Sequence, residues 1–366
     1  LSANAQHSIT LNAALDSAIK NNAMHKAGAM QIEYAQALQK TSTEIDKTFF
    51  DFGVGKLNSF QTDNRFGVSQ NLQFPIIYKN QAAVNRSVTQ IAQTSQLIRD
   101  QELRHLVKSQ YYEVLIINKQ LELLMVADTM YANFLQKAND RLVAGASDVL
   151  EKATAENQLL QIQNQLSKLT TAENIAIENF NRTLNTSNKV RPALDSIVYG
   201  GSVMPTLSLV DELPIVQLQQ QQVVLSEQMS TLEKSKLNPS FSVGYSTMTI
   251  KGWQAISQTT DQYYGASDRF GSVSLGLMVP IFSSAQKARI NASNILIKQK
   301  KLEETAVKNE MTQKMQNALT LFLQHKKAVE AYQLKGLPSA LVIMQTATQK
   351  LKAGEINYLD WVVLMN

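Results

Sequence analysis

Hydrophobic and polar residues alternate with a period of two in four stretches of the chain. The period of two is typical of β-strands whose faces meet different surroundings. It predicts strands at about residues 48–58, 65–74, 240–250 and 270–279. In the second stretch Gln70 is the one polar residue on the apolar face, which otherwise carries Phe66, Val68, Leu72 and Phe74.

Two long segments between these stretches have the composition of helices. From Tyr78 to Leu142 the sequence contains neither Pro nor Gly and is rich in helix-forming Gln, Leu, Ala, Lys and Glu. As one helix it would be roughly 97 Å long, about three times the ~30 Å core of a bilayer. A second long helix is expected from Ser283 to Leu351, interrupted by Gly336 and Pro338.

Shorter helices are expected beside them. A helix starting near Ser8 has Thr10 as its N-cap and extends to about residue 46, and another covers about 210–236. A return helix covers 148–184, where Asp148 and Glu151 have the spacing of a capping box.

The order of these elements repeats along the chain. Each half reads helix, strand, hairpin loop, strand, proline, long helix, Ala-Gly turn and return helix, with Pro75 and Pro280 at the two strand–helix junctions. We therefore expect a first repeat at 1–190, a linker at 191–205 containing a short strand at 196–199, and a second repeat at 206–366. The second return helix has barely begun at Asn366, so we expect it to be truncated there, and no signal peptide is visible at Leu1.

The composition of the chain argues against several classes of function. The net charge is +5 with scattered Lys and Arg, which gives no basic stripe for nucleic acid, and the absence of Cys removes thiolate chemistry. No run approaches the ~18 apolar residues of a membrane helix. The four histidines lack metal-ligand spacing and no catalytic or phosphate-binding motif is present, so we expect no enzyme, cofactor or metal site.

The strands and helices together indicate a membrane conduit. An apolar face opposite a face of Gly, Ser, Asn and Gln matches the lipid and water sides of an outer-membrane barrel. Four strands cannot close a barrel, and edges open to lipid would leave backbone groups unpaired, so several copies must combine their strands. Helices leaving the strands and returning would form an antiparallel tube. The alternative is a non-channel periplasmic or surface coiled-coil protein with a structural or interaction role.

Four passages resemble the TolC-like outer-membrane efflux proteins, also called outer membrane factors. They are residues 8–15 (SITLNAAL), 67–76 (GVSQNLQFPI), 141–150 (RLVAGASDVL) and 351–360 (LKAGEINYLD). The resemblance implies a mostly α-helical fold with membrane β-strands, in which three chains with four strands each form a twelve-stranded barrel continued by an α-helical barrel. It implies a passive exit duct in the outer membrane of a Gram-negative bacterium, with a large periplasmic portion. It implies that the duct belongs to a tripartite efflux or type I secretion system. Its partners would then be outer-membrane lipid, a periplasmic adaptor and, indirectly, an inner-membrane pump.

The resemblance also implies roles for the helix turns. The turns are expected to contact the adaptor through Leu142, Val143, Ala144 and Gly145 in the first and Leu351, Lys352, Ala353 and Gly354 in the second. Asp148, Glu355 and Asp360 form a candidate periplasmic gate, since acidic rings narrow pores and attract cations. Asp148 and Asp360 also suit the positive N-terminus of a return helix, which is the interpretation we favour for them, and ordinary capping by glycine can operate in the turns alongside docking. Pro338 should bend or break the last long helix.

Overall fold

The computed structural model describes residues 7–186, 189–193 and 207–365. The short strand expected at 196–199 lies outside these residues. The chain divides into two compact units: a sheet unit formed by residues 28–96 and 210–309, and a tip unit formed by residues 1–27, 97–209 and 310–366. This division in space groups segments from both halves of the sequence. The expected division into two repeats therefore stays a prediction about the order of elements.

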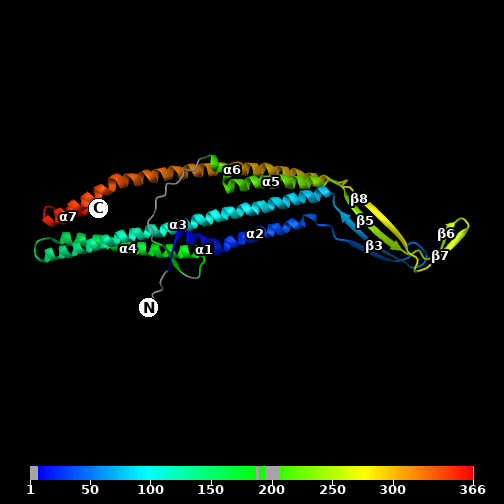
Figure 1. The fold of residues 1–366 in the computed structure, drawn as a ribbon, viewed down its shortest axis with the longest axis horizontal. Helices are drawn as coiled ribbons and strands as arrows, with labels where there is room; N and C mark the ends of the chain where they lie inside the picture. Colours follow the sequence, from blue (N-terminus) through cyan, green and yellow to red (C-terminus); the bar gives the residue numbers. More distant parts are fainter. Residues whose placement is uncertain (1–6, 187–188, 194–206, 366) are drawn as a thin grey trace, which may run out of the picture. The chain divides into compact units, whose positions relative to one another are not determined.

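Four antiparallel strands form the main sheet of the sheet unit (Figure 1). They are β2 (Phe49–Gly55), β3 (Asp63–Leu72), β5 (Ser240–Met248) and β8 (Phe270–Met278), in the order β2-β3-β5-β8. The register sets Phe50, Val68, Tyr245 and Val273 in one row across the sheet. Rows rich in apolar residues alternate with rows of mostly small or polar residues, as the period of two predicts; the exceptions in the latter rows include Phe49, Met248 and Phe270.

The segment 252–269, between the strands expected at 240–250 and 270–279, is not simply a loop, because it contains a second hairpin. β6 (Gly252–Ser257) and β7 (Thr260–Tyr264) pair antiparallel, and Trp253 and Tyr263 face each other with ring centroids 5.6 Å apart. Cross-strand aromatic pairs stabilise such a ribbon. Its turn has Gln258 and Thr259 in place of the Asn-Gly or Asp-Gly signal, so the sequence gives little sign of it.

Asp63 holds the loops at one end of the sheet together. Its carboxylate is fully buried and accepts hydrogen bonds from the backbone N–H of Asn58 (3.2 Å) and of Lys251 (2.9 Å). The hydroxyls of Ser59 (2.9 Å) and Thr249 (3.2 Å) also donate to it. A buried carboxylate needs such donors, and here they come from both halves of the chain.

Helix pairs in the sheet unit are joined by polar side chains. The helices are α2 (Ala23–Gln39), the start of α3 (Pro75–Val143), α5 (Pro214–Ser235) and the start of α6 (Ser284–Ala331). Gln39 donates to Thr89 across α2 and α3 at 2.7 Å, and Gln286 donates to the Glu233 carbonyl across α6 and α5 at 2.7 Å. The apolar contacts are fewer and centre on Ile77, Val84 and Leu232.

The first expected helix is divided into several elements. β1 (His7–Ile9) comes first and pairs parallel with β4 (Val190–Pro192), and α1 (Leu11–Asn21) follows it with Thr10 as N-cap. Asn22 has extended backbone angles, and its side chain accepts from the N–H of Met24 at 3.0 Å. Asn22 thus caps α2, which gives way to a 3₁₀ turn at Lys40–Thr43.

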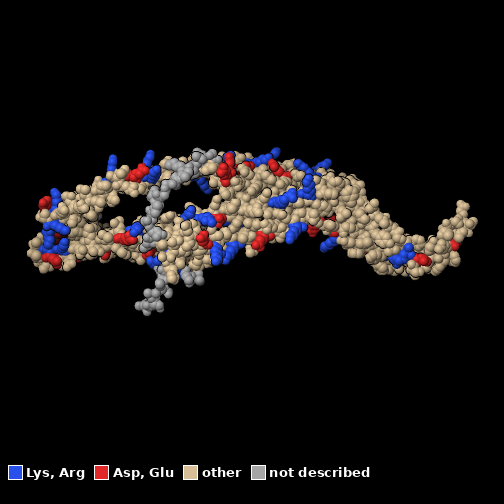
Figure 2. Space-filling view, viewed as in Figure 1, with Lys and Arg blue, Asp and Glu red and all other residues tan. Residues whose placement is uncertain are grey.

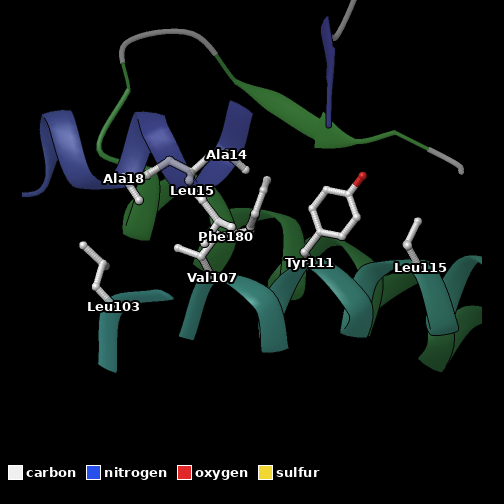
Figure 3. Close-up of a cluster of buried hydrophobic side chains, with 9 residues drawn as sticks. Ala14, Leu15, Ala18, Leu103, Val107, Tyr111, Leu115 and Phe180 are labelled. Atoms are coloured by element: carbon white, nitrogen blue, oxygen red, sulfur yellow. The ribbon is translucent and has the colours of Figure 1, made fainter. Parts of the chain in front are cut away.

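In the tip unit α1 packs on α3 and α4 (Val149–Leu184). Ala14, Leu15 and Ala18 face Val107 and Phe180, and the ring of Tyr111 lies beside them (Figure 3). The Tyr111 hydroxyl donates to the Ala193 carbonyl at 3.2 Å. The small alanines let the backbones approach closely, so this cluster fixes α1 against the long helix.

The last long helix continues past Pro338 without a break. A π-helical turn at Tyr332–Gly336 separates α6 from α7 (Leu337–Ala353), and Pro338 lies in the first turn of α7. A π-helical turn lets the helix accommodate the backbone hydrogen bond that proline cannot donate. α8 (Tyr358–Met365) follows, and among the described residues no helix is long and apolar enough to cross a bilayer.

Candidate functional site: the helix turns and the exposed sheet

The two Ala-Gly turns of the tip unit have the same backbone geometry. Gly145 and Gly354 both have positive φ, 71° and 77°. The N–H of the next residue, Ala146 or Glu355, bonds the carbonyl five residues before it at 2.9 Å. This is the Schellman arrangement that ends a helix. Nothing lies within 4 Å of a Cβ built on either glycine, so backbone conformation alone selects glycine here.

The acidic residues after the turns are not equivalent in position. Asp148 is the N-cap of α4 and accepts from the N–H of Glu151 at 3.0 Å. The corresponding residue after the second turn is Asn357, which accepts from the N–H of Asp360 at 2.8 Å. Asp360 therefore corresponds in register to Glu151. Only half of the expected capping box forms, because the Glu151 carboxylate accepts from the Ser147 hydroxyl instead.

The turn residues present a small exposed surface. Val143 is 82 % exposed, and Ala144, Lys352 and Ala353 are exposed too, while Leu142 and Leu351 are half-buried. Both turns lie at the same end of the tip unit (Figure 1). The arrangement offers two similar short turns, which suits an end-on contact with another protein.

An aromatic cluster beneath the turns was not expected from the sequence. Trp361 of α8 is fully buried, with its ring centroid 4.1 Å from that of Phe134 and 6.1 Å from that of Tyr131. Tyr358 stacks beside it. The matching i, i+3 spacings, 131 and 134 on α3 with 358 and 361 on α8, are the signal that could have indicated it.

A cavity of about 310 Å³ opens beside this cluster. Apolar parts of Phe134, Ala138, Leu351 and Tyr358 line it together with Thr348 and four charged residues, Lys137, Arg141, Lys352 and Glu151. Figure 2 shows Lys and Arg side chains gathered at this end of the tip unit. Burial, together with the neighbouring Tyr131 and Glu151, raises the pKa of the Tyr358 hydroxyl to about 12.

The apolar face of the main sheet is exposed. Phe50, Phe52, Val273, Leu275 and Leu277 are all more than half exposed, Leu275 to 81 %. The amide of Gln70 on this face bonds the Asp46 carbonyl and the Thr48 hydroxyl. β5 and β8 contain no charged residue, and Figure 2 shows few charges over these strands. A contiguous apolar surface of this kind marks a membrane or protein contact.

The two prolines at the strand–helix junctions differ in their position relative to the helix that follows. Pro75 is the first residue of α3, where its fixed φ suits a helix start, while Pro280 lies four residues before α6.

Among the described residues no group of three or more His, Asp or Glu side chains could hold a metal ion.

Solved structures of outer-membrane channels share this fold. The Campylobacter jejuni CmeC outer membrane channel is 14 % identical, with a TM-score of 0.74 over 97 % of this chain and 79 % of that one. The outer-membrane channel OprN is 12 % identical, with a TM-score of 0.77 over 97 % and 83 %. The Vibrio cholerae outer membrane protein VceC is 10 % identical, with a TM-score of 0.74 over 97 % and 89 %.

No family model and no curated protein sequence matches the chain. At identities of 10–14 % the structural likeness establishes the fold. The predicted fold class, mostly helical with membrane-type strands as in outer-membrane channels, is confirmed.

Proposed function

We propose that this chain is one protomer of a passive exit duct in the outer membrane of a Gram-negative bacterium. The observation that carries the proposal is the four-stranded sheet with an exposed apolar face and an opposite face of mostly small or polar residues. Lipid on one side and water on the other are the surroundings that such a sheet requires. The channel fold of CmeC, OprN and VceC supports the same conclusion.

The duct is an oligomer. In the described part of the chain β2 and β8 each have a strand neighbour on one side only, and open edges cannot stay in lipid. Closed barrels need about eight strands or more, so at least two chains must join β8 of one to β2 of the next. The resemblance to TolC-like proteins favours three chains and twelve strands.

The helices form the periplasmic part of the duct. α3 alone is 69 residues, about 100 Å, and the polar contacts between helices suit walls that face water on both sides. The two repeats at 1–190 and 206–366 are joined by an equatorial linker at 191–205. Each repeat supplies an equivalent part of the wall of the duct.

The helix turns are where the duct meets its periplasmic adaptor. The turns at 142–145 and 351–354 dock on the adaptor, which links the duct to an inner-membrane pump for efflux or type I secretion. Docking opens the tip, where Asp148, Glu355 and Asp360 narrow the passage. The exposure of Val143, Ala144 and Ala353 supports this contact.

Conductance tests the proposal. The purified protein, added to planar lipid bilayers, should give stepwise conductance and should migrate in mild detergent as an oligomer. A protein that stays monomeric without detergent and never conducts would instead be the coiled-coil structural protein.

A further inference from the structure

We infer that the cavity at the end of the tip unit is a socket for an acidic side chain of the docking partner. The inference rests on the proposed function and adds to it the chemistry by which the adaptor is recognised. The cavity lies between α3, α4, α7 and α8, next to both helix turns, and its volume is about 310 Å³.

The lining has an excess of positive charge. Three cations, Lys137, Arg141 and Lys352, face one carboxylate, Glu151. Glu151 is already engaged, with Arg141 at 3.9 Å and with the Ser147 hydroxyl as donor. Lys137 and Lys352 form no ion pair with any described residue, and the Lys137 ammonium lies 5.8 Å from the centre of the Phe134 ring. Two cations are therefore available to an incoming anion.

A buried donor of the same cavity also lacks a partner. Tyr358 is only 3 % exposed, and its hydroxyl makes no hydrogen bond with the described residues. An unpaired buried hydroxyl is costly, and its high pKa keeps it a donor at any physiological pH. A carboxylate bound here would pair with the lysines, and a shift of the Tyr358 side chain that uncovers its hydroxyl would let that hydroxyl donate as well; charge-assisted bonds of this kind are strong.

The apolar walls favour a side chain over a free inorganic anion. Phe134, Ala138 and Leu351 line the cavity beside the cations. The methylenes of a glutamate would cover these walls while its carboxylate reaches the lysines and Tyr358. A phosphate or sulfate ion would leave them uncovered. The occupant is therefore a glutamate or aspartate presented by the adaptor's own end.

The test uses the adaptor that restores dye export together with this channel, purified, as the binding probe. Binding to the detergent-solubilised channel is measured for wild type and for the double variant Lys137→Glu/Lys352→Glu. Losing both cations should weaken binding by about a hundredfold, since each close charge pair is worth tenfold or more. Lys350→Glu, on the same helix turn but outside the cavity lining, is the matched control and should bind within about threefold of wild type.

Two further variants separate recognition from folding. Tyr358→Phe removes only the unpaired hydroxyl, so it should fold at least as well as wild type and yet bind several-fold more weakly. Changing an acidic residue at the adaptor's end to Lys should restore binding to the double variant. If the double variant binds the adaptor as well as Lys350→Glu does, the proposed binding of an acidic side chain in this cavity is refuted. The proposed function as an exit duct would be unaffected by that result. If no adaptor binds the wild-type channel or restores export, the proposed function itself fails.

Discussion

Replacing Trp361 with Ala should release α8 from the end of α3. The Trp361 side chain is fully buried and touches Tyr131, Phe134 and Tyr358. Truncating a buried Trp to Ala costs about 3–5 kcal/mol. The indole N–H has no hydrogen-bond partner among the described residues, and removing it recovers about 1 kcal/mol. The expected net loss of local stability is about 2–4 kcal/mol.

Native-state hydrogen exchange, read by mass spectrometry on peptides covering α8, measures this loss directly. A loss of about 2–4 kcal/mol should make these amides exchange roughly 30- to 900-fold faster. Trp361→Phe, which keeps an aromatic ring and removes the unpaired N–H, should change the rate by less than about tenfold.

The matched control is Trp253→Ala in the β6–β7 hairpin. Trp253 is 71 % exposed, so its loss should leave exchange in α8 unchanged. Equal exchange rates in α8 for wild type and Trp361→Ala would show that the aromatic cluster does not hold α8 in place.

Three further outcomes are expected. Gly354→Val should lower stability by about 1–2 kcal/mol, because φ is 77° there, whereas Gly354→Asn should be nearly neutral, and thermal unfolding compares them. Leu275→Arg on the apolar sheet face should cost about 2–4 kcal/mol of membrane insertion and reduce the oligomer recovered from outer membranes, while Ser272→Arg on the opposite face should be tolerated. Burial, with Tyr131 and Glu151, raises the pKa of Tyr358 from 10 to about 12, so its neutral form adds stability that is complete below pH 10. That stability should fall by at most ~3 kcal/mol as pH rises from 10 to 12, in wild type but not in Tyr358→Phe, and denaturant unfolding at fixed pH detects the difference.

The regular elements could be predicted because their signals are local. Alternation from Arg65 to Phe74 sets the faces of β3, and the run without Pro or Gly after Tyr78 sets α3, which begins three residues earlier because Pro75 suits a first helical position. Each Ala-Gly turn is likewise encoded by its own glycine.

The contacts that complete the tip depend on residues far apart in the chain. Trp361 meets Phe134 only after α3 and α7 are both in place, and Lys137 and Lys352 line one cavity from different helices. The carboxylate of Asp63 likewise accepts hydrogen bonds from residues 58–59 and 249–251, which are brought together only in the folded sheet. The positions of Asp148 and Asp360 looked alike in the sequence, but the caps show that Asn357 corresponds to Asp148.

Disulfide cross-linking between β2 and β8 tests most directly that several chains close one barrel. The chain contains no Cys, so paired substitutions are the only thiols present. They would be placed on one face of β2, at Phe49, Asp51 or Gly53, and on the same face of β8, at Ser272, Ser274 or Gly276. In outer membranes at least one pair should give a covalent ladder that ends at three chains and collapses on reduction. Uncross-linked single chains from every pair would contradict the shared barrel.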